Sequence, residues 1–303
     1  MAEPTPAGGE GVAWVFPGQG SQWVGMGRTL AATDADAAAV FATVDAALGF
    51  ALSAIVFDGP EDALRETANQ QPAILAVSVA YHAVLRARGL LPDAALVAGH
   101  SLGEYAALVA AGALDLGDAA RLVRRRGELM TEHGAGAMAA IIGLPPAAVA
   151  EVAAEAGAEV ANFNAPDQTV VSGHHDAVAT VMALATARGA KRALPLPVSG
   201  AFHSSLMAPV AAAMRPLLAA TPLRRAHSPL VGNVAARPIA EPDTLREELV
   251  GHICAPVRWV DVVSTLTEAG VGTFYEVGPG KVLAGLVARC ARGARTITAE
   301  SLL

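Results

Sequence analysis

The sequence predicts an α/β fold: a hydrolase-like core with a parallel sheet and a nucleophile elbow, plus an inserted ferredoxin-like α+β subdomain. Two short apolar runs without polar alternation, residues 12–16 and 95–99, predict buried strands, and helical stretches follow them. A Gly-x-Ser-x-Gly sequence at residues 99–103 stands between such a strand and a helix. Residues 134–198 show the order β-α-β-β-α-β, which is typical of the ferredoxin-like motif.

The composition indicates a globular chain with a large apolar core. Of its 303 residues, 53% are apolar and 16% are charged, and no apolar run approaches the ~20 residues that cross a bilayer. The N-terminus has neither a basic region nor an apolar stretch, so we expect residues 1–11 to be a flexible tail. The two cysteines suit a reducing, cytoplasmic setting and suggest no metal site, and the net charge of −7 argues against general attraction to nucleic acid.

A change of pattern near residue 134 divides the chain. We expect a large α/β part from residues 12–133 and 199–303, and a small subdomain from residues 134–198. Helical patterns are found at residues 29–56, 70–89, 102–113 and 115–131.

Ser101 is the first candidate for a catalytic residue. A tight turn between a strand and a helix requires small neighbours, here Gly99 and Gly103, and it exposes the serine hydroxyl at the start of the helix. Free backbone N–H groups there can stabilise an oxyanion, and that of Leu102 is the natural donor. The pattern favours a nucleophilic serine over a chance glycine turn.

A serine nucleophile needs a base, and the chain has eight histidines. His203, in a loop that leads into a helix, is the best candidate, although the pattern also fits a purely structural histidine. His100 adjoins the serine, where consecutive side chains diverge, so we expect it to line the pocket. Asp167 and Asp176 have the chain order of a triad acid, but both occupy turn positions that capping explains. We therefore predict a Ser-His dyad, with the imidazole oriented by a backbone carbonyl.

Arg126 stands in an unusual place for a charged residue. At 100° per residue it falls in the middle of an apolar helical stripe. An unpaired buried charge is costly, so the guanidinium should have an anionic partner, and its planar fork suits a carboxylate. The partner is either an internal Asp or Glu or the free carboxylate of an acyl substrate. The stripe consists of Ala119, Leu122, Val123, Leu129 and Met130.

Six segments between about residues 12 and 290 form one ordered set. They are "VFPGQGSQWVGMG", "QQPAIL", "GHSLGEYAALVAAG", "RRRGELM", "VSGAFHSSLM" and "FYEVGPGKVL". Together they resemble the malonyl-CoA:acyl carrier protein transacylase family, which includes discrete enzymes of bacterial fatty-acid synthesis and acyltransferase domains of polyketide synthases. The resemblance implies an acyltransferase with a ping-pong mechanism.

The resemblance also implies a role for each matching residue. Ser101 would be the nucleophile and His203 the base. The backbone N–H of Gln19 would join that of Leu102 in the oxyanion hole. Arg126 would bind the free carboxylate of a malonyl group.

Further roles follow from the same resemblance. Gln71 would line the acyl pocket, and Asn162 would lie in the cleft facing the serine. The carbonyl of His252 would orient His203, at a position where the family often has a polar residue other than histidine. Phe202 resembles the malonyl-selective pattern, because a ring leaves little room for an α-methyl branch, so we expect malonyl to be preferred over methylmalonyl.

The implied activity is transfer of a malonyl group from malonyl-CoA to the phosphopantetheine thiol of an acyl carrier protein, through a malonyl-Ser101 ester. The CoA thioester is then a substrate, phosphopantetheine belongs to the carrier, and no bound cofactor is expected. The expected partners are malonyl-CoA and the carrier protein, without nucleic acid or membrane, and the expected state is a monomer. Two alternatives remain: a trans-acting polyketide acyltransferase for a substituted malonyl or other acyl unit, and a hydrolase of carrier or CoA thioesters.

Overall fold

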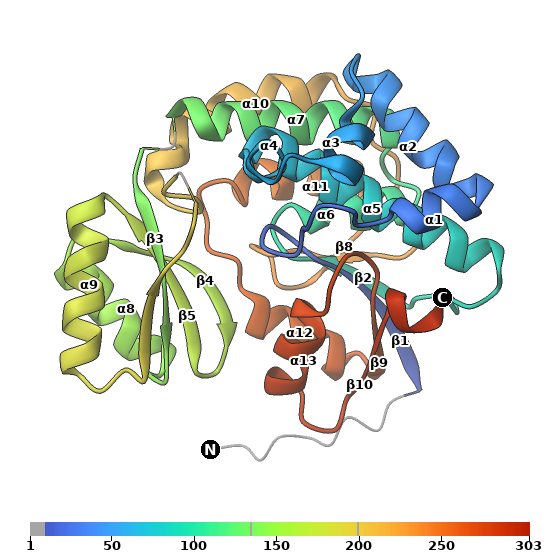
Figure 1. Ribbon diagram of the computed structural model, residues 1–303. Helices are drawn as coiled ribbons and strands as arrows, with labels where there is room; N and C mark the ends of the chain where they lie inside the picture. Colours follow the sequence, from blue (N-terminus) through green and yellow to red (C-terminus); the bar gives the residue numbers. More distant parts are fainter. Residues whose placement is uncertain (1–9, 134, 199) are drawn as a thin grey trace.

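The computed structural model describes residues 10–133, 135–198 and 200–303, and two sheets of different kinds lie side by side in it (Figure 1). Within these residues the larger sheet has six strands in the order β10-β9-β1-β2-β7-β8. Neighbouring strands run parallel, except for β7 and β8. The expected α/β class with a mostly parallel sheet is confirmed. The strands are β1 (Gly11–Phe16), β2 (Leu96–Gly99), β7 (Leu230–Val231), β8 (Pro238–Ile239), β9 (Val271–Glu276) and β10 (Arg295–Thr298).

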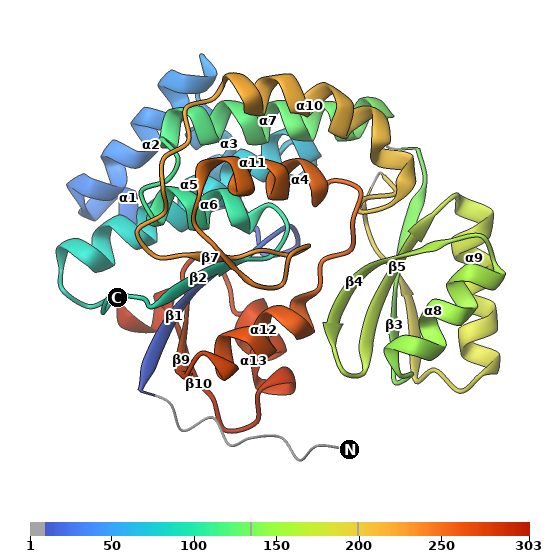
Figure 2. The same cartoon turned by 180° about the vertical axis from the view of Figure 1, so that it is seen from behind.

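Helices cover both faces of this sheet, which explains why its central strands β1 and β2 are apolar throughout. In β1, Ala13 and Val15 face one core, and Trp14 and Phe16 face the other, and all four are at most 5% exposed. Figure 2 shows α12 and α13 on one side of these strands and the other helices of the large part on the opposite side. The helices on the two sides together are α1 (Arg28–Thr33), α2 (Ala35–Leu48), α3 (Leu52–Asp58), α4 (Glu61–Arg65), α5 (Thr67–Ala87), α6 (Gly103–Ala110), α7 (Leu116–His133), α10 (Ala208–Ala220), α11 (Pro242–Gly251), α12 (Trp259–Glu268) and α13 (Val282–Cys290). Two short 3₁₀ turns cover Ser205–Met207 and Ala299–Leu302.

The helical pattern expected over residues 29–56 is interrupted twice in the structure. Asp34 ends α1 and caps α2, because its side chain accepts the N–H of Asp36 at 3.0 Å. Gly49 ends α2 with a φ of 75°, a left-handed conformation that favours glycine. Both breaks depend on single capping residues, so the apolar periodicity alone does not reveal them.

The smaller sheet is antiparallel, and its elements follow the predicted β-α-β-β-α-β order. Its strands pair in the order β4-β5-β3-β6. One face packs on α8 and α9, with Ile141 and Val171 in the shared core. The other face contributes Met138 and Val170 to the main core. The elements are β3 (Ala137–Ile142), α8 (Pro146–Glu155), β4 (Glu159–Ala165), β5 (Gln168–Gly173), α9 (His175–Ala187) and β6 (Arg192–Pro195).

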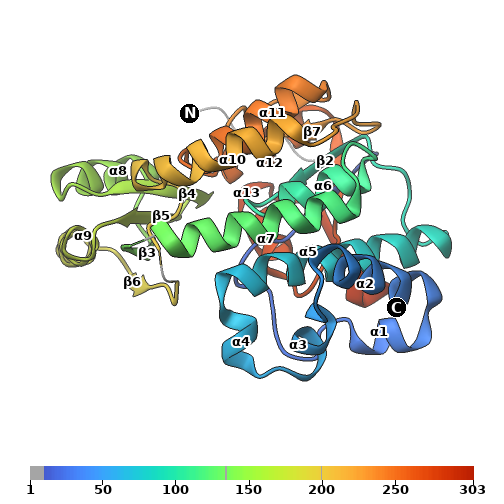
Figure 3. The same ribbon diagram turned by 90° about the horizontal axis from the view of Figure 1, so that it is seen from above.

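The two sheets are joined by a long helix and by an edge strand. Seen from above, α7 runs from the large part toward the small sheet, with α10 alongside (Figure 3). At the edge of the small sheet, β4 pairs with Val257: Phe163 donates its N–H to the Val257 carbonyl at 2.9 Å, and Val257 donates to Ala161 at 2.9 Å. The small sheet is therefore bonded directly to the segment that follows α11.

Several boundaries predicted from the sequence coincide with residues that the structure does not describe. The expected tail, residues 1–11, lies outside the described residues except for Glu10 and Gly11. Positions 134 and 199, at the expected borders of the subdomain, also lie outside them. No helix in the described ranges is both long and apolar enough to cross a bilayer.

Candidate active site

Ser101 lies in the turn between β2 and α6, where the backbone is packed very closely. Its φ is 53°, a left-handed value that is uncommon for serine. A Cβ on Gly99 would lie 2.0 Å from the backbone carbon of Gly103, and one on Gly103 would lie 2.1 Å from the carbonyl oxygen of Phe16. The two glycines are required because any side chain there would separate β1, β2 and α6. The turn holds Ser101 at 9% exposure, at the carboxyl end of a parallel strand.

His203 meets Ser101 across the fold. Its Nε2 is 2.8 Å from the Ser101 Oγ. Its Nδ1 lies 2.7 Å from the carbonyl oxygen of His252 and 3.1 Å from that of Ala255. Carbonyl oxygens only accept hydrogen bonds, so this network assigns the hydrogen to Nδ1 and leaves the Nε2 lone pair facing the serine hydroxyl. Like Ser101, His203 has a positive φ, 58°.

The surroundings keep the His203 imidazole neutral. Burial lowers its pKa well below the usual 6.5, and the positive charge of Arg126 lowers it further. The hydrogen bond to the His252 carbonyl acts in the opposite direction, but it is the smaller effect. A neutral imidazole with a free Nε2 lone pair can accept a proton from serine.

Arg126 is fully buried, and its guanidinium reaches the nucleophile. One terminal nitrogen donates to the Gln71 Oε1 at 2.9 Å, and the other donates to the Ser101 Oγ at 3.1 Å. Within the described part of the chain, no Asp or Glu forms an ion pair with Arg126, and its Nε has no hydrogen-bond partner. Within these residues no internal carboxylate contacts Arg126, although the buried Glu104 acts on its charge without a hydrogen bond.

The other predicted residues surround this centre. Phe202 is 4% exposed and precedes His203. Among the described residues, the backbone N–H groups of Gln19 and Leu102 make no internal hydrogen bond, whereas the Gln19 side chain donates to the Gln70 Oε1 at 2.5 Å. Two free N–H groups are what an oxyanion hole needs.

Two asparagines near the elbow were missed by the sequence analysis. Asn233 accepts the Ser101 N–H at 2.7 Å and donates to the Gly99 carbonyl at 2.6 Å. Asn164 Oδ1 lies 2.8 Å from the His100 Nε2, whereas the predicted Asn162, buried on the same strand, makes no side-chain hydrogen bond within the described residues. The alternation "NFN" could have indicated the second asparagine, since residues two apart share one face of a strand. Asn233 lies in a loop, where no periodicity marks it.

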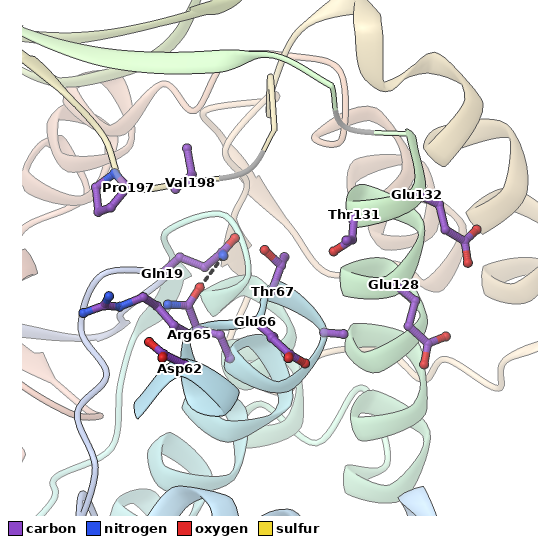
Figure 4. Close-up of a pocket in the computed structure, with 12 residues that line it drawn as sticks. Gln19, Asp62, Arg65, Glu66, Thr67, Glu128, Thr131, Glu132, Pro197 and Val198 are labelled. Atoms are coloured by element: carbon purple, nitrogen blue, oxygen red, sulfur yellow. Dashed lines mark hydrogen bonds between the residues drawn. The ribbon is translucent and has the colours of Figure 1, made fainter. Parts of the chain in front are cut away.

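A cavity of about 790 Å³ opens beside the Gln19 loop (Figure 4). Gln19 lies on one side, Pro197 and Val198 lie above it, and α7 with Thr131 closes the other side; Gln70, the partner of Gln19, also lines the cavity. Its charged lining is mainly acidic and consists of Asp62, Arg65, Glu66, Glu128 and Glu132. The cavity provides space next to Gln19, one of the two residues predicted to form the oxyanion hole.

Comparisons with known proteins show the family of this chain. The acyl transferase domain family matches residues 13–303. The malonyl CoA-acyl carrier protein transacylase of Escherichia coli K12 is 45% identical over 96% of this chain and 95% of its own length, and that of Bacillus subtilis 168 is 43% identical over 94% and 92%.

Solved structures of similar sequence have the same fold. The acyl-carrier-protein S-malonyltransferase from Bartonella henselae has a TM-score of 0.93 and 42% identity, covering 96% of this chain and 97% of that one. A malonyl-transacylase in complex with its type II PKS acyl-carrier protein in the holo form has a TM-score of 0.92 and 40% identity, covering 95% and 96%.

Proposed function

Because the chain belongs to the malonyl CoA-acyl carrier protein transacylase family, we propose that Ser101 carries a malonyl group from malonyl-CoA to the phosphopantetheine thiol of an acyl carrier protein. One observation carries the choice of acyl group. Arg126 is buried against the Ser101 Oγ, and the described residues give it no carboxylate partner. An acyl group with a free carboxylate would supply that partner and so be bound in preference to a neutral one.

The first half of the reaction would form the acyl-enzyme. His203 takes the hydroxyl proton on Nε2 while the Ser101 Oγ bonds to the thioester carbonyl carbon. The N–H groups of Gln19 and Leu102 stabilise the oxyanion. When the intermediate collapses, the carbon–sulfur bond breaks, and His203 returns its proton to the sulfur of CoA.

The second half would repeat these steps in reverse. His203 takes the proton of the carrier's phosphopantetheine thiol, and the sulfur attacks the malonyl-Ser101 ester. The ester bond breaks, and His203 returns the proton to the Ser101 Oγ. No oxidation state changes, so the two half-reactions need only a general base, an oxyanion hole and a carboxylate-binding group, and Arg126 supplies the last.

The acidic cavity beside Gln19 fits the arm that both substrates share. The pantetheine arm is uncharged and rich in amides, whereas the nucleotide of CoA carries phosphates. Four carboxylates and Arg65 line the cavity. Glu128 and Glu132 are paired with Arg124 and Arg125, so the negative charge that would repel phosphates there comes from Asp62 and Glu66, which form no ion pair within the described residues. We place the arm in this cavity and the nucleotide outside it.

Phe202 would set the size of the acyl group. Phe202 is 4% exposed and adjoins His203 in the chain, and a ring at this place would leave little space for an α-methyl branch. The Phe202→Ser variant should raise the rate with methylmalonyl-CoA relative to malonyl-CoA about 10-fold, since one methyl group is worth about 1–3 kcal/mol in such a pocket. An unchanged ratio of the two acylation rates would argue against this assignment.

Intact-protein mass spectrometry tests the proposal directly. The protein mixed with malonyl-CoA should gain one malonyl group, which should leave it when holo acyl carrier protein is added and appear on the carrier. The Ser101→Ala variant is the control and should gain none. A wild-type protein that stays unmodified would overturn the proposal, and an adduct lost to water at the same rate with or without carrier would indicate a hydrolase.

A further inference from the structure

Glu104 is a buried carboxyl group that the proposed reaction does not use. It lies on α6, three residues after Ser101, and is fully buried. Its Oε1 accepts the backbone N–H of Asn233 at 2.7 Å. Its Oε2 lies 2.5 Å from the Nδ1 of His252, whose ring is also fully buried. The carboxyl group therefore joins the elbow helix to two other segments.

Each of those two segments is also linked to Ser101 by hydrogen bonds. Asn233 accepts the backbone N–H of Ser101 through its Oδ1 at 2.7 Å. The carbonyl of His252 accepts from the Nδ1 of His203, whose Nε2 meets the Ser101 Oγ. The bonds therefore form a closed ring from Ser101 through Asn233, Glu104, His252 and His203 back to Ser101. Only Ser101 and His203 would touch reacting atoms.

His252 acts on the base through its backbone and on Glu104 through its side chain. It follows the last residue of α11, where a carbonyl has no partner from the next helical turn, so its direction depends on how the residue is held. The ring of the same residue is held by Glu104. The contact between ring and carboxyl group therefore fixes the carbonyl that orients His203.

We propose that the side-chain contact between Glu104 and His252 positions the catalytic base, by fixing the His252 carbonyl that holds the His203 imidazole toward Ser101. This inference rests on the proposed function of Ser101 and His203. Glu104 and His252 are positioning residues. Asn233 completes the arrangement, because it ties the same carboxyl group to the backbone of the nucleophile.

Burial raises the pKa of Glu104 and lowers that of His252, so both shifts favour uncharged partners. A neutral amide should therefore be able to replace the carboxyl group. Its oxygen can accept from Asn233, and its NH₂ can donate to the His252 Nδ1. A methyl group in the same place can do neither.

The sharpest test changes the His252 side chain and keeps its carbonyl. His252→Leu removes the ring contact, and we expect the rate constant for malonyl-Ser101 formation to fall about 10- to 100-fold, because small misplacements of catalytic groups have effects of this size. The KM for malonyl-CoA should stay within about threefold of wild type, since no acyl contact is lost. His252→Gln, whose amide can bond to Glu104, should restore most of the rate.

Glu104 variants provide a second measurement with a matched control. Glu104→Gln should stay near the wild-type rate, and Glu104→Ala should resemble His252→Leu. Glu276 is an equally buried carboxylate that accepts two backbone N–H groups, those of Leu283 and Ala284, outside the ring. Glu276→Ala should lower the unfolding temperature without lowering the acylation rate of folded protein.

Two outcomes would overturn the positioning role of Glu104 and His252, and a third would refute the proposed function. A folded His252→Leu protein that acylates at the wild-type rate would overturn the proposal, as would rates for Glu104→Ala and Glu276→Ala that fall equally per folded molecule. If Glu104→Ala does not fold, the two His252 variants still give the answer. A wild-type protein that forms no malonyl adduct would refute the proposed function instead.

Discussion

The small antiparallel subdomain and the site beside the large sheet differ in the side chains that they bury. The core beneath α8 and α9 is apolar, with Ile141, Val149 and Val181 fully buried, and no charged side chain among the described residues of that subdomain is buried. Beside the large sheet, a fully buried arginine and a fully buried glutamate lie near two buried histidines, and both Ser101 and His203 have a positive φ that is uncommon outside glycine. Within the described residues, buried ionisable groups and positive φ at residues other than glycine therefore occur in the large part and not in the small subdomain.

The largest effect that this contrast predicts is at the buried guanidinium. Arg126→Ala should lower malonyl acylation of Ser101 about 100- to 1000-fold, because a charge-assisted contact made inside a buried site is lost. Neutral acyl-CoA thioesters should lose much less, so the ratio of malonyl to acetyl rates should fall. Rapid-quench acylation with both thioesters measures this ratio, and a malonyl preference equal to that of wild type would remove Arg126 from the acyl site.

Backbone packing at the elbow should come next. Gly103→Ala places a methyl group 2.1 Å from the Phe16 carbonyl oxygen, so the strand and helix must move apart. We expect a loss of about 3 kcal/mol or more in the free energy of unfolding, as for overpacking that shifts the backbone. Gly157→Ala in the small subdomain meets no atom within 4 Å and has only its positive φ of 72° as a cost, about 1 kcal/mol. Urea denaturation of both variants provides the comparison, and equal losses would contradict it.

The pH profile should report the buried base. His203 must be neutral to accept the serine proton, and its pKa is lowered mainly by burial. A lowered pKa keeps the imidazole neutral at more acidic pH, so the acidic limb of kcat/KM should have its midpoint below 6.5, the usual histidine value. Steady-state assays across this range test the sign, and a midpoint above 6.5 would mean that the carbonyl bond outweighs burial.

The smallest effect should come from the regular core of the small subdomain. Ile141→Val removes one methylene group from a fully buried position and should cost about 0.5–1.5 kcal/mol of stability. The acylation rate per folded molecule should be unchanged, since Ile141 packs in the core shared with α8 and α9. Thermal unfolding and burst-phase acylation measure the two quantities, and a clear loss of rate would show that the two regions are coupled through this core.

Regular patterns explain how much of this could be predicted from sequence. The apolar runs predicted β1 and β2 because both faces of a parallel sheet are covered, and the 3.6-residue period placed Arg126 on a buried stripe. Glu104 left a signal that was not used: α6 is apolar on most sides, so a charge within it is buried in almost any orientation. Asn233 could not have been found, because its position depends on a loop that returns to the elbow from a distant part of the chain.

The pairing of β4 with Val257 has a consequence for exchanging parts between related proteins. The same short segment carries the His252 and Ala255 carbonyls that hold the His203 imidazole. The edge strand β4 is therefore hydrogen-bonded to the segment that orients the base. A foreign subdomain grafted at this place must reproduce the register of its first β-hairpin against that segment. A graft shifted by one residue would turn every side chain of the strand to the opposite face, and it would disable proton transfer without altering any residue that handles the acyl group.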